Sequence, residues 1–141
     1  MMKSIIILTK KDKQVVDITD EVQKVVSAEK TGEGVCSIFV AHTTCALTTA
    51  DLDPGTDLDT LDALEKMFPE GDYRHPHDPS HVGEHILSSI IGSSVNIPVS
   101  DGNLILGTWQ RVVLIELSGP RERNIYSIGC KAKTTSLRTG G

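Results

Sequence analysis

Histidine is the residue type in this sequence best suited to chemistry at neutral pH. Four of the five histidines lie between Tyr73 and His85, and the fifth, His42, follows an apolar run. Neutral imidazole nitrogens bind zinc and similar ions, and three of them with a water molecule make a catalytic site with an open position. The candidate set is His42, His75 and His85. No H-E-x-x-H motif is present, so two alternatives stay open: a metal or catalytic site, and ordinary core or surface histidines.

Two aspartates offer a second place for a metal. Asp51 and Asp53 begin an acidic run that extends to Asp62 around a Pro-Gly turn. The spacing resembles a calcium loop, but the glycine lies one place early, so an EF-hand is not expected. Two interpretations remain. The carboxylates favour the N-terminal end of a helix, or Asp51 and Asp53 bind magnesium carried by a diphosphate substrate.

Polar residues interrupt the aliphatic C-terminal half at a few positions. Gln110 and Glu116 bracket an aliphatic stretch, and a carboxylate there needs a partner such as arginine, a metal or a protonated histidine. Arg121 and Arg123 form a close basic cluster that suits one phosphate or carboxylate. The only tryptophan, Trp109, is compatible by itself with a core residue whose indole N–H finds a partner.

The elements that would position these residues begin with two strands. We predict that segments 4–9 and 14–18 form a hairpin around the polar turn KKDK. A helix follows and stops near Gly32. The segment 35–40 is largely apolar on both alternate sets, which predicts a central strand covered on both faces. His42 shares the parity of one of these sets, so its ring is expected to point toward an interior or cleft face.

Two further helices are expected in the middle of the chain. Apolar residues recur at helical spacing from Leu58 to Phe68, and this helix ends at Pro69. After a polar loop, a second helical face ends before Gly92 and consists of Val82, His85, Ile86, Ser89 and Ile90. His85 is therefore predicted to face inward.

The C-terminal part is predicted to contain only strands. The segments are 94–99, 104–107, 112–117 and 124–130, and we expect them to form an antiparallel meander. Asp101 and Gly102 between two of them are a strong hairpin signal. Strands first, helices in the middle and strands last indicate an α+β fold, a compact single domain of largely antiparallel sheet with two to three helices in the first two thirds.

Composition limits the possible functions. A chain of 141 residues with 38% hydrophobic and 23% charged residues is typical of one soluble domain, assigned here to residues 1–141 with a polar tail at about 132–141. A net charge of −5 disfavours nucleic acid as a partner. The apolar run 5–8 is too short for a signal sequence or a membrane span. The three cysteines lack metal-site spacing. We therefore expect a cytoplasmic protein with reduced thiols.

Several motifs together resemble those of one known family. They are HTTCALT from His42, YRH from Tyr73, EHILSSIIGSS from Glu84, IPVSDGNLILGTWQ from Ile97 and ELSGPRER from Glu116. The combination covers nearly the whole of residues 38–131 and resembles the YjbQ family of small bacterial and archaeal proteins. The resemblance implies an α+β homotrimer in which His42, His75 and His85 gather in a pocket near a subunit interface.

The resemblance also implies an activity. Members of the family are commonly described as secondary thiamine-phosphate synthases, which join hydroxymethylpyrimidine diphosphate to thiazole phosphate and release pyrophosphate. Carried over by motif, Trp109, Gln110 and Glu116 belong to the site, and Thr43 and Thr44 orient His42 or bind an anionic substrate. Family members often have Asn-Glu where this chain has TTADLDPGTD, so contacts made by those residues would pass to Asp51 and Asp53.

Three functions follow as hypotheses. The first is the synthase, in which magnesium, Arg121, Arg123 and protonated histidine neutralise the leaving diphosphate. The second is a hydrolase of a small phosphorylated substrate, in which the three histidines hold zinc and Glu116 acts as base or supports the metal site. The third is a ligand-binding trimer without catalysis. All three predict a small-metabolite partner, and none requires an organic cofactor.

Overall fold

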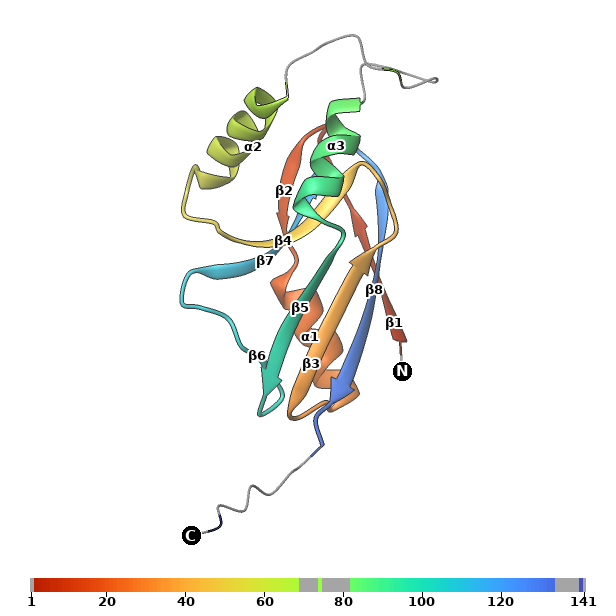
Figure 1. Ribbon diagram of the computed structural model, residues 1–141, viewed down its shortest axis with the longest axis vertical. Helices are drawn as coiled ribbons and strands as arrows, with labels where there is room; N and C mark the ends of the chain where they lie inside the picture. Colours follow the sequence, from red (N-terminus) through yellow and green to blue (C-terminus); the bar gives the residue numbers. More distant parts are fainter. Residues whose placement is uncertain (1, 69–73, 75–81, 134–139, 141) are drawn as a thin grey trace.

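The computed structural model describes residues 2–68, 74, 82–133 and 140, which form three helices and two antiparallel sheets (Figure 1). The helices are α1 (Thr19–Glu29), α2 (Thr56–Met67) and α3 (Val82–Ile91). His75 and most of the predicted polar tail lie outside the described residues. The α+β fold class is confirmed.

The large sheet has five strands in the order β1-β8-β3-β5-β6. Their bounds are β1 Met2–Leu8, β8 Glu122–Lys131, β3 Gly34–Val40, β5 Ser94–Ser100 and β6 Asn103–Leu104. The hairpin predicted at Asp101 and Gly102 is confirmed, because both residues have positive φ, 51° and 74°, and Ser100 pairs with Asn103. Two central residues with positive φ are what a tight two-residue hairpin requires.

The small sheet has three strands in the order β2-β7-β4. Their bounds are β2 Gln14–Asp17, β7 Gln110–Glu116 and β4 Cys45–Asp51. The predicted N-terminal hairpin is wrong, because β1 pairs with β8 in the large sheet and β2 pairs with β7 in the small one. The predicted C-terminal meander is wrong for the same reason: β7 and β8 follow one another in sequence but belong to different sheets.

One core lies between the two sheets and the helix α1. It is aliphatic, and β7 contributes Val112 and Leu114 to it. The alternate residues of β7, Val113 and Ile115, face a second cluster that includes Leu87 of α3 and side chains of α2. The strand that is covered on both faces is therefore β7.

The prediction that β3 is covered on both faces is wrong for the single chain. Its residues Cys36, Ile38 and Val40 are buried, but Val35 and Phe39 are exposed. The inner set packs against the core between the sheets, and no element of the described chain covers the outer set. The central strand β3 therefore has an exposed apolar outer set.

Candidate functional site

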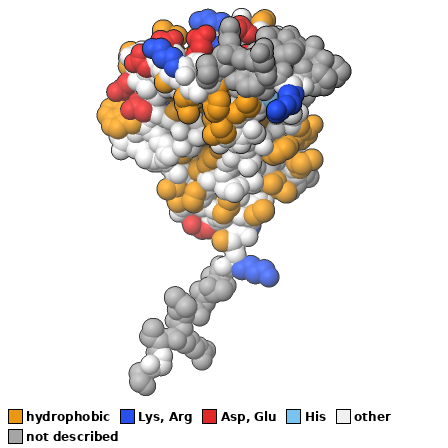
Figure 2. All heavy atoms as spheres, turned by 45° about the horizontal axis from the view of Figure 1, so that its top comes forward, with side chains coloured by type: hydrophobic (Ala, Val, Ile, Leu, Met, Phe, Trp, Pro, Cys, Tyr) orange, Lys and Arg blue, Asp and Glu red, His pale blue; other side chains and the backbone are white. Residues whose placement is uncertain are grey.

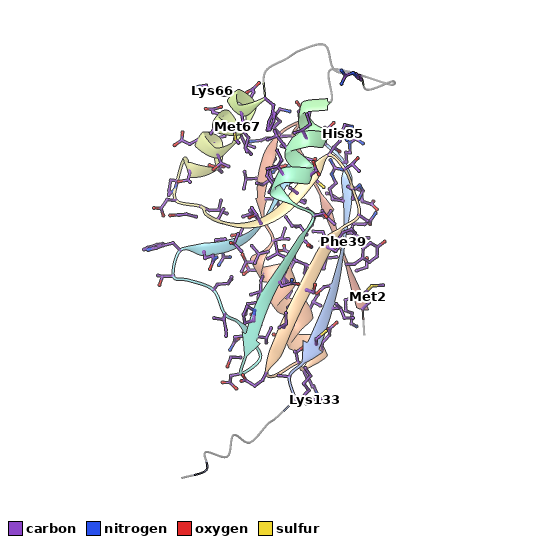
Figure 3. All side chains as sticks on the ribbon, in the orientation of Figure 1. Met2, Phe39, Lys66, Met67, His85 and Lys133 are labelled. Carbon is purple, nitrogen blue, oxygen red and sulfur yellow. The ribbon has the colours of Figure 1, made fainter. Side chains whose placement is uncertain are left out.

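A polar pocket lies where β3 ends and α3 ends. It has a volume of about 430 Å³ and is lined by His42, Thr43, His85, Ser88, Ser89, Gly92 and Ser93. His42 and Thr43 belong to the short connection between β3 and β4, and His85 belongs to α3, near the top of Figure 3. The structure thus brings together two of the three predicted histidines.

Backbone contacts at the strand ends create this pocket. The N–H of Val40 donates to the carbonyl of Ser93 at 2.8 Å, and the N–H of Leu47 donates to that of Gly92 at 3.0 Å. The buried Ser88 hydroxyl donates to the carbonyl of Cys45 at 2.6 Å. These bonds fix the C-terminal turn of α3 against the loop that carries His42.

The orientation of α3 differs from the prediction. Among the described side chains of α3, Leu87 and Ser88 are buried, whereas Ser89 and Ile90 are exposed. His85 is partly buried and lies at the border of the packed face. The sequence pattern misplaced the face because Ser88 is buried through its hydrogen bond rather than through hydrophobicity.

A backbone group holds the imidazole of His42. Its Nε2 accepts a hydrogen bond from the N–H of Asn124 at 3.0 Å. Burial lowers the pKa of His42, the nearby Arg123 and Arg121 lower it further, and Glu116 opposes them in part. The ring is therefore neutral at pH 7, and the hydrogen bond assigns its proton to Nδ1.

Behind His42, a buried ion pair joins the two sheets. Glu116 of β7 and Arg123 of β8 have exposed side-chain fractions of 0% and 1%. The guanidinium donates to both carboxylate oxygens, through Nε at 2.8 Å and through Nη2. The Thr9 hydroxyl and the N–H groups of Leu117 and Ser118 complete the shell of the carboxylate.

The same guanidinium fixes the histidine loop. Nη2 of Arg123 also donates to the carbonyl oxygen of Thr44 at 3.0 Å and to its Oγ1 at 2.9 Å. Burial raises the pKa of Glu116, but the bonds from Arg123, Thr9 and Ser118 outweigh it and hold the pKa below its ordinary value. The carboxylate is thus charged and saturated with donors.

These positions change the interpretation of four predicted site residues. Glu116, Arg123 and Thr44 are buried in the ion-pair network and do not line the pocket. A base with every lone pair engaged does not fit Glu116, and gripping a substrate does not fit Arg123. Arg121 is exposed, with Nε donating to the carbonyl of Ser118 at 2.6 Å. The sequence predicted that Glu116 needs a partner, and in the structure that partner is Arg123.

Three other predicted residues, Asp51, Asp53 and Trp109, lie at a second pocket. This pocket has a volume of about 270 Å³ and is lined by Asp17, Asp51, Leu52, Asp53, Thr108, Trp109 and Arg111. Trp109 is 69% exposed, so it is not a core residue. Gln110 bonds locally, to Thr49 at 2.9 Å. Within one chain, Trp109, Gln110, Asp51 and Asp53 do not join the histidine pocket.

No group of three or more metal-binding side chains occurs among residues 2–68, 74 and 82–133. The predicted trio of histidines includes His75, which lies outside those residues. Sequence reasoning missed the serines of the pocket and the backbone N–H of Asn124. The run SSIIGSS was visible as a motif, whereas the role of a backbone amide carries no sequence signal.

The chain is similar to a family of bacterial and archaeal proteins. The family model described as "UPF0047 protein YjbQ-like" matches residues 3–129. The chain belongs to the YjbQ family. A UPF0047 protein from Archaeoglobus fulgidus is 36% identical over 118 residues, which are 83% of this chain and 91% of that protein. The UPF0047 protein YugU of Bacillus subtilis is 33% identical over 127 residues, 89% of this chain and 96% of its own length.

Solved structures of YjbQ-like proteins share the fold. A YbjQ-like protein of unknown function from Sulfolobus solfataricus superposes with a TM-score of 0.84 at 32% identity, covering 90% of this chain and 94% of that one. A hypothetical protein from Aeropyrum pernix superposes with a TM-score of 0.87 at 31% identity, covering 94% of this chain and 99% of that one. None of the helices in the described parts of the chain is long and apolar enough to cross a membrane.

Proposed function

We propose that the histidine pocket binds a small phosphorylated metabolite and that the protein is an enzyme resembling secondary thiamine-phosphate synthase. The observation that carries the proposal is the pocket itself, in which two imidazoles meet several hydroxyl groups in about 430 Å³. Such a volume suits a small ligand, and convergent polar groups in one cavity are typical of a binding site. The positive charge of Arg121 acts on the same region, because it helps to lower the pKa of His42.

The proposed reaction requires the pocket to stabilise a leaving diphosphate. The thiazole nitrogen forms a bond to the methylene carbon of the pyrimidine, and the bond from that carbon to the diphosphate oxygen breaks. The leaving oxygen keeps the electron pair, so donors directed at the diphosphate lower the barrier. The neutral His42 supplies such a donor at Nδ1, and Thr43 supplies a hydroxyl at the same wall.

The zinc hydrolase is less well supported. A histidine ligates zinc through an unprotonated nitrogen, and the unprotonated Nε2 of His42 already accepts the N–H of Asn124. The magnesium role of Asp51 and Asp53 would place the ion at the second pocket, beside Trp109. A synthase that uses magnesium would therefore bring it with the diphosphate.

The test is product formation by the purified, untagged protein from the two thiamine precursors, together with complementation of a thiamine auxotroph. We expect His85→Ala to lose activity, and Cys130→Ser, which changes an exposed residue at the far end of β8, to keep it. A folded wild-type protein that is inactive in both assays would refute the synthase. Tight binding of a phosphorylated metabolite without turnover would support the non-catalytic alternative.

We further propose that the protein is a homotrimer that covers the outer face of the large sheet. Seven exposed apolar side chains share this face: Met2, Ile6, Leu8, Val35, Phe39, Tyr126 and Ile128. Strand pairing places them together, because Met2 lies opposite Ile128 and Phe39 opposite Tyr126. Figure 2 shows hydrophobic side chains on the right, where Figure 1 has β1 and β8, and Figure 3 labels Met2 and Phe39 on that side.

A contiguous apolar face of this kind favours association, and burial in an oligomer would remove it from water. Light scattering coupled to size exclusion measures the mass directly. We expect three times 15.2 kDa for the wild type and a smaller species for Phe39→Glu. Leu58→Glu changes an exposed residue on α2 and should leave the mass of the assembly unchanged. A monomeric wild type would refute this proposal.

A further inference from the structure

The polar groups that line the histidine pocket differ in whether they can donate or only accept a hydrogen bond. On the wall formed by the strand ends, Nε2 of His42 is occupied by the N–H of Asn124, which leaves Nδ1–H as a donor. The hydroxyls of Thr43 and Ser93 have no hydrogen bond to another of the described residues, so they can donate to a ligand. This wall offers protons.

The two serine hydroxyls of α3 behave in the opposite way. The Ser88 hydroxyl gives its proton to the carbonyl of Cys45 at 2.6 Å, and the Ser89 hydroxyl gives its proton to the carbonyl of Ile86 at 2.9 Å. A hydroxyl has one proton and two lone pairs, so each oxygen can only accept from a ligand. The bond of Ser88 is buried, which prevents water from replacing it.

The donor at His42 is fixed by the sheet. Asn124 pairs with Ile6 of β1, and its carbonyl accepts the N–H of Ala41 at 3.3 Å. Its own N–H is thereby held toward the imidazole. A proton on Nε2 would set two N–H donors against each other across 3.0 Å, and each would lack an acceptor in a partly buried place. The tautomer with Nδ1–H is the one that this backbone selects.

We infer that the pocket selects an oxyanion that carries a proton, namely a phosphate group, and discriminates against sulfate. A phosphate with one hydroxyl presents bare oxygens to His42, Thr43 and Ser93 and its own O–H to Ser88. Sulfate at neutral pH has acceptors only, so it leaves the oxygen of Ser88 facing a second acceptor without a proton between them. The inference rests on the proposed binding pocket but not on the synthase reaction.

The test compares inorganic phosphate with sulfate by calorimetry at pH 6.5 and equal ionic strength, in protein without added metal. We expect phosphate to bind at least about tenfold more tightly, which is the effect of one unsatisfied buried polar group. Ser88→Ala should lower the affinity for phosphate to nearly that for sulfate, while the affinity for sulfate changes little. Ser27→Ala, on the exposed end of α1, should keep the wild-type ratio of the two affinities. Equal binding of the two anions, tighter sulfate, or no binding of either overturns the inference.

A second readout does not depend on any ligand. Two-bond ¹H–¹⁵N spectra of the ¹⁵N-labelled protein separate protonated from unprotonated ring nitrogens, and we expect Nδ1 of His42 to be protonated at pH 7.5. An unprotonated Nδ1 overturns the assignment of the donor wall. Phosphate selectivity without product formation would leave this inference standing and refute the synthase, so the two failures are distinguishable.

Discussion

Replacing the buried Arg123 should lower the stability of the fold more than any substitution on the surface of this protein. In Arg123→Met, Glu116 loses two of its five hydrogen bonds, and Thr44 loses the donor that holds its carbonyl and its hydroxyl. Breaking a buried ion pair from one side costs about 3–5 kcal/mol, because the remaining charge has no counterion. That is a large share of the roughly 5–15 kcal/mol by which a domain is stable.

The double variant makes this prediction sharper. In Glu116→Gln/Arg123→Met no charge is buried, and the amide can still accept from the N–H groups of Leu117 and Ser118. Adding Glu116→Gln to Arg123→Met should therefore restore part of the free energy of unfolding, on the scale of about 0.5–3 kcal/mol at which residues in one network couple. If the two groups acted independently, the second substitution would not recover stability that the first had lost.

Urea unfolding at one fixed protein concentration measures these differences. The control is Arg111→Met, the same substitution in the pair with Asp17, whose side chains are 38% and 36% exposed. We expect Arg111→Met to lower the free energy of unfolding by about 0–1 kcal/mol. A cost below about 1 kcal/mol for Arg123→Met, or a double variant less stable than that single variant, would refute the reasoning about the buried network.

Three other outcomes follow from the structure. Because the pKa of His42 is lowered from its ordinary 6.5, the unfolded chain binds its proton first as the pH falls through that value. Stability should thus decline with falling pH more in the wild type than in His42→Gln, by urea titration. Gly34→Ala would place a methyl group 2.0 Å from the carbonyl oxygen of Cys130 and should strongly destabilise the fold. A Cβ at Gly83 on α3 meets no atom of the described residues within 4 Å, so Gly83→Ala should stabilise the fold by up to about 1 kcal/mol. Burial raises the pKa of Cys45 to about 11, so a thiol reagent should modify the exposed Cys130 in the native protein and Cys45 only after unfolding.

Much of the secondary structure could be predicted from local pattern. The helix 56–67 and the strands β5, β7 and β8 were expected from the sequence, whereas the strand predicted at 104–107 is reduced to Asn103–Leu104. Apolar period and turn residues act over a few positions, which is why these elements were predictable. The hairpin at Asp101 was predictable for the same reason: its backbone requires positive φ at two adjacent residues. His42 and His85 were predictable as candidates because imidazole is rare and chemically versatile.

Strand pairing was not predictable in this way. The strands β1 and β2 look like a hairpin, yet β1 pairs with β8 and β2 pairs with β7, strands that lie near the other end of the sequence. Alternation specifies which face of a strand is buried but not which strand lies beside it. Only packing of both sheets around α1 decides that β7 is the strand covered twice and that β3 has an exposed apolar face.

The sequence by itself determined the residue types of the site, and the tertiary structure decided their roles. Glu116 was recognisable as a carboxylate in need of a partner, but its saturation by Arg123 depends on two sheets meeting at one point. The tautomer of His42 depends on the backbone N–H of Asn124, which every residue except proline possesses. Side-chain chemistry is encoded locally, whereas protonation and hydrogen-bond direction arise from neighbours that only folding brings within 3 Å or so.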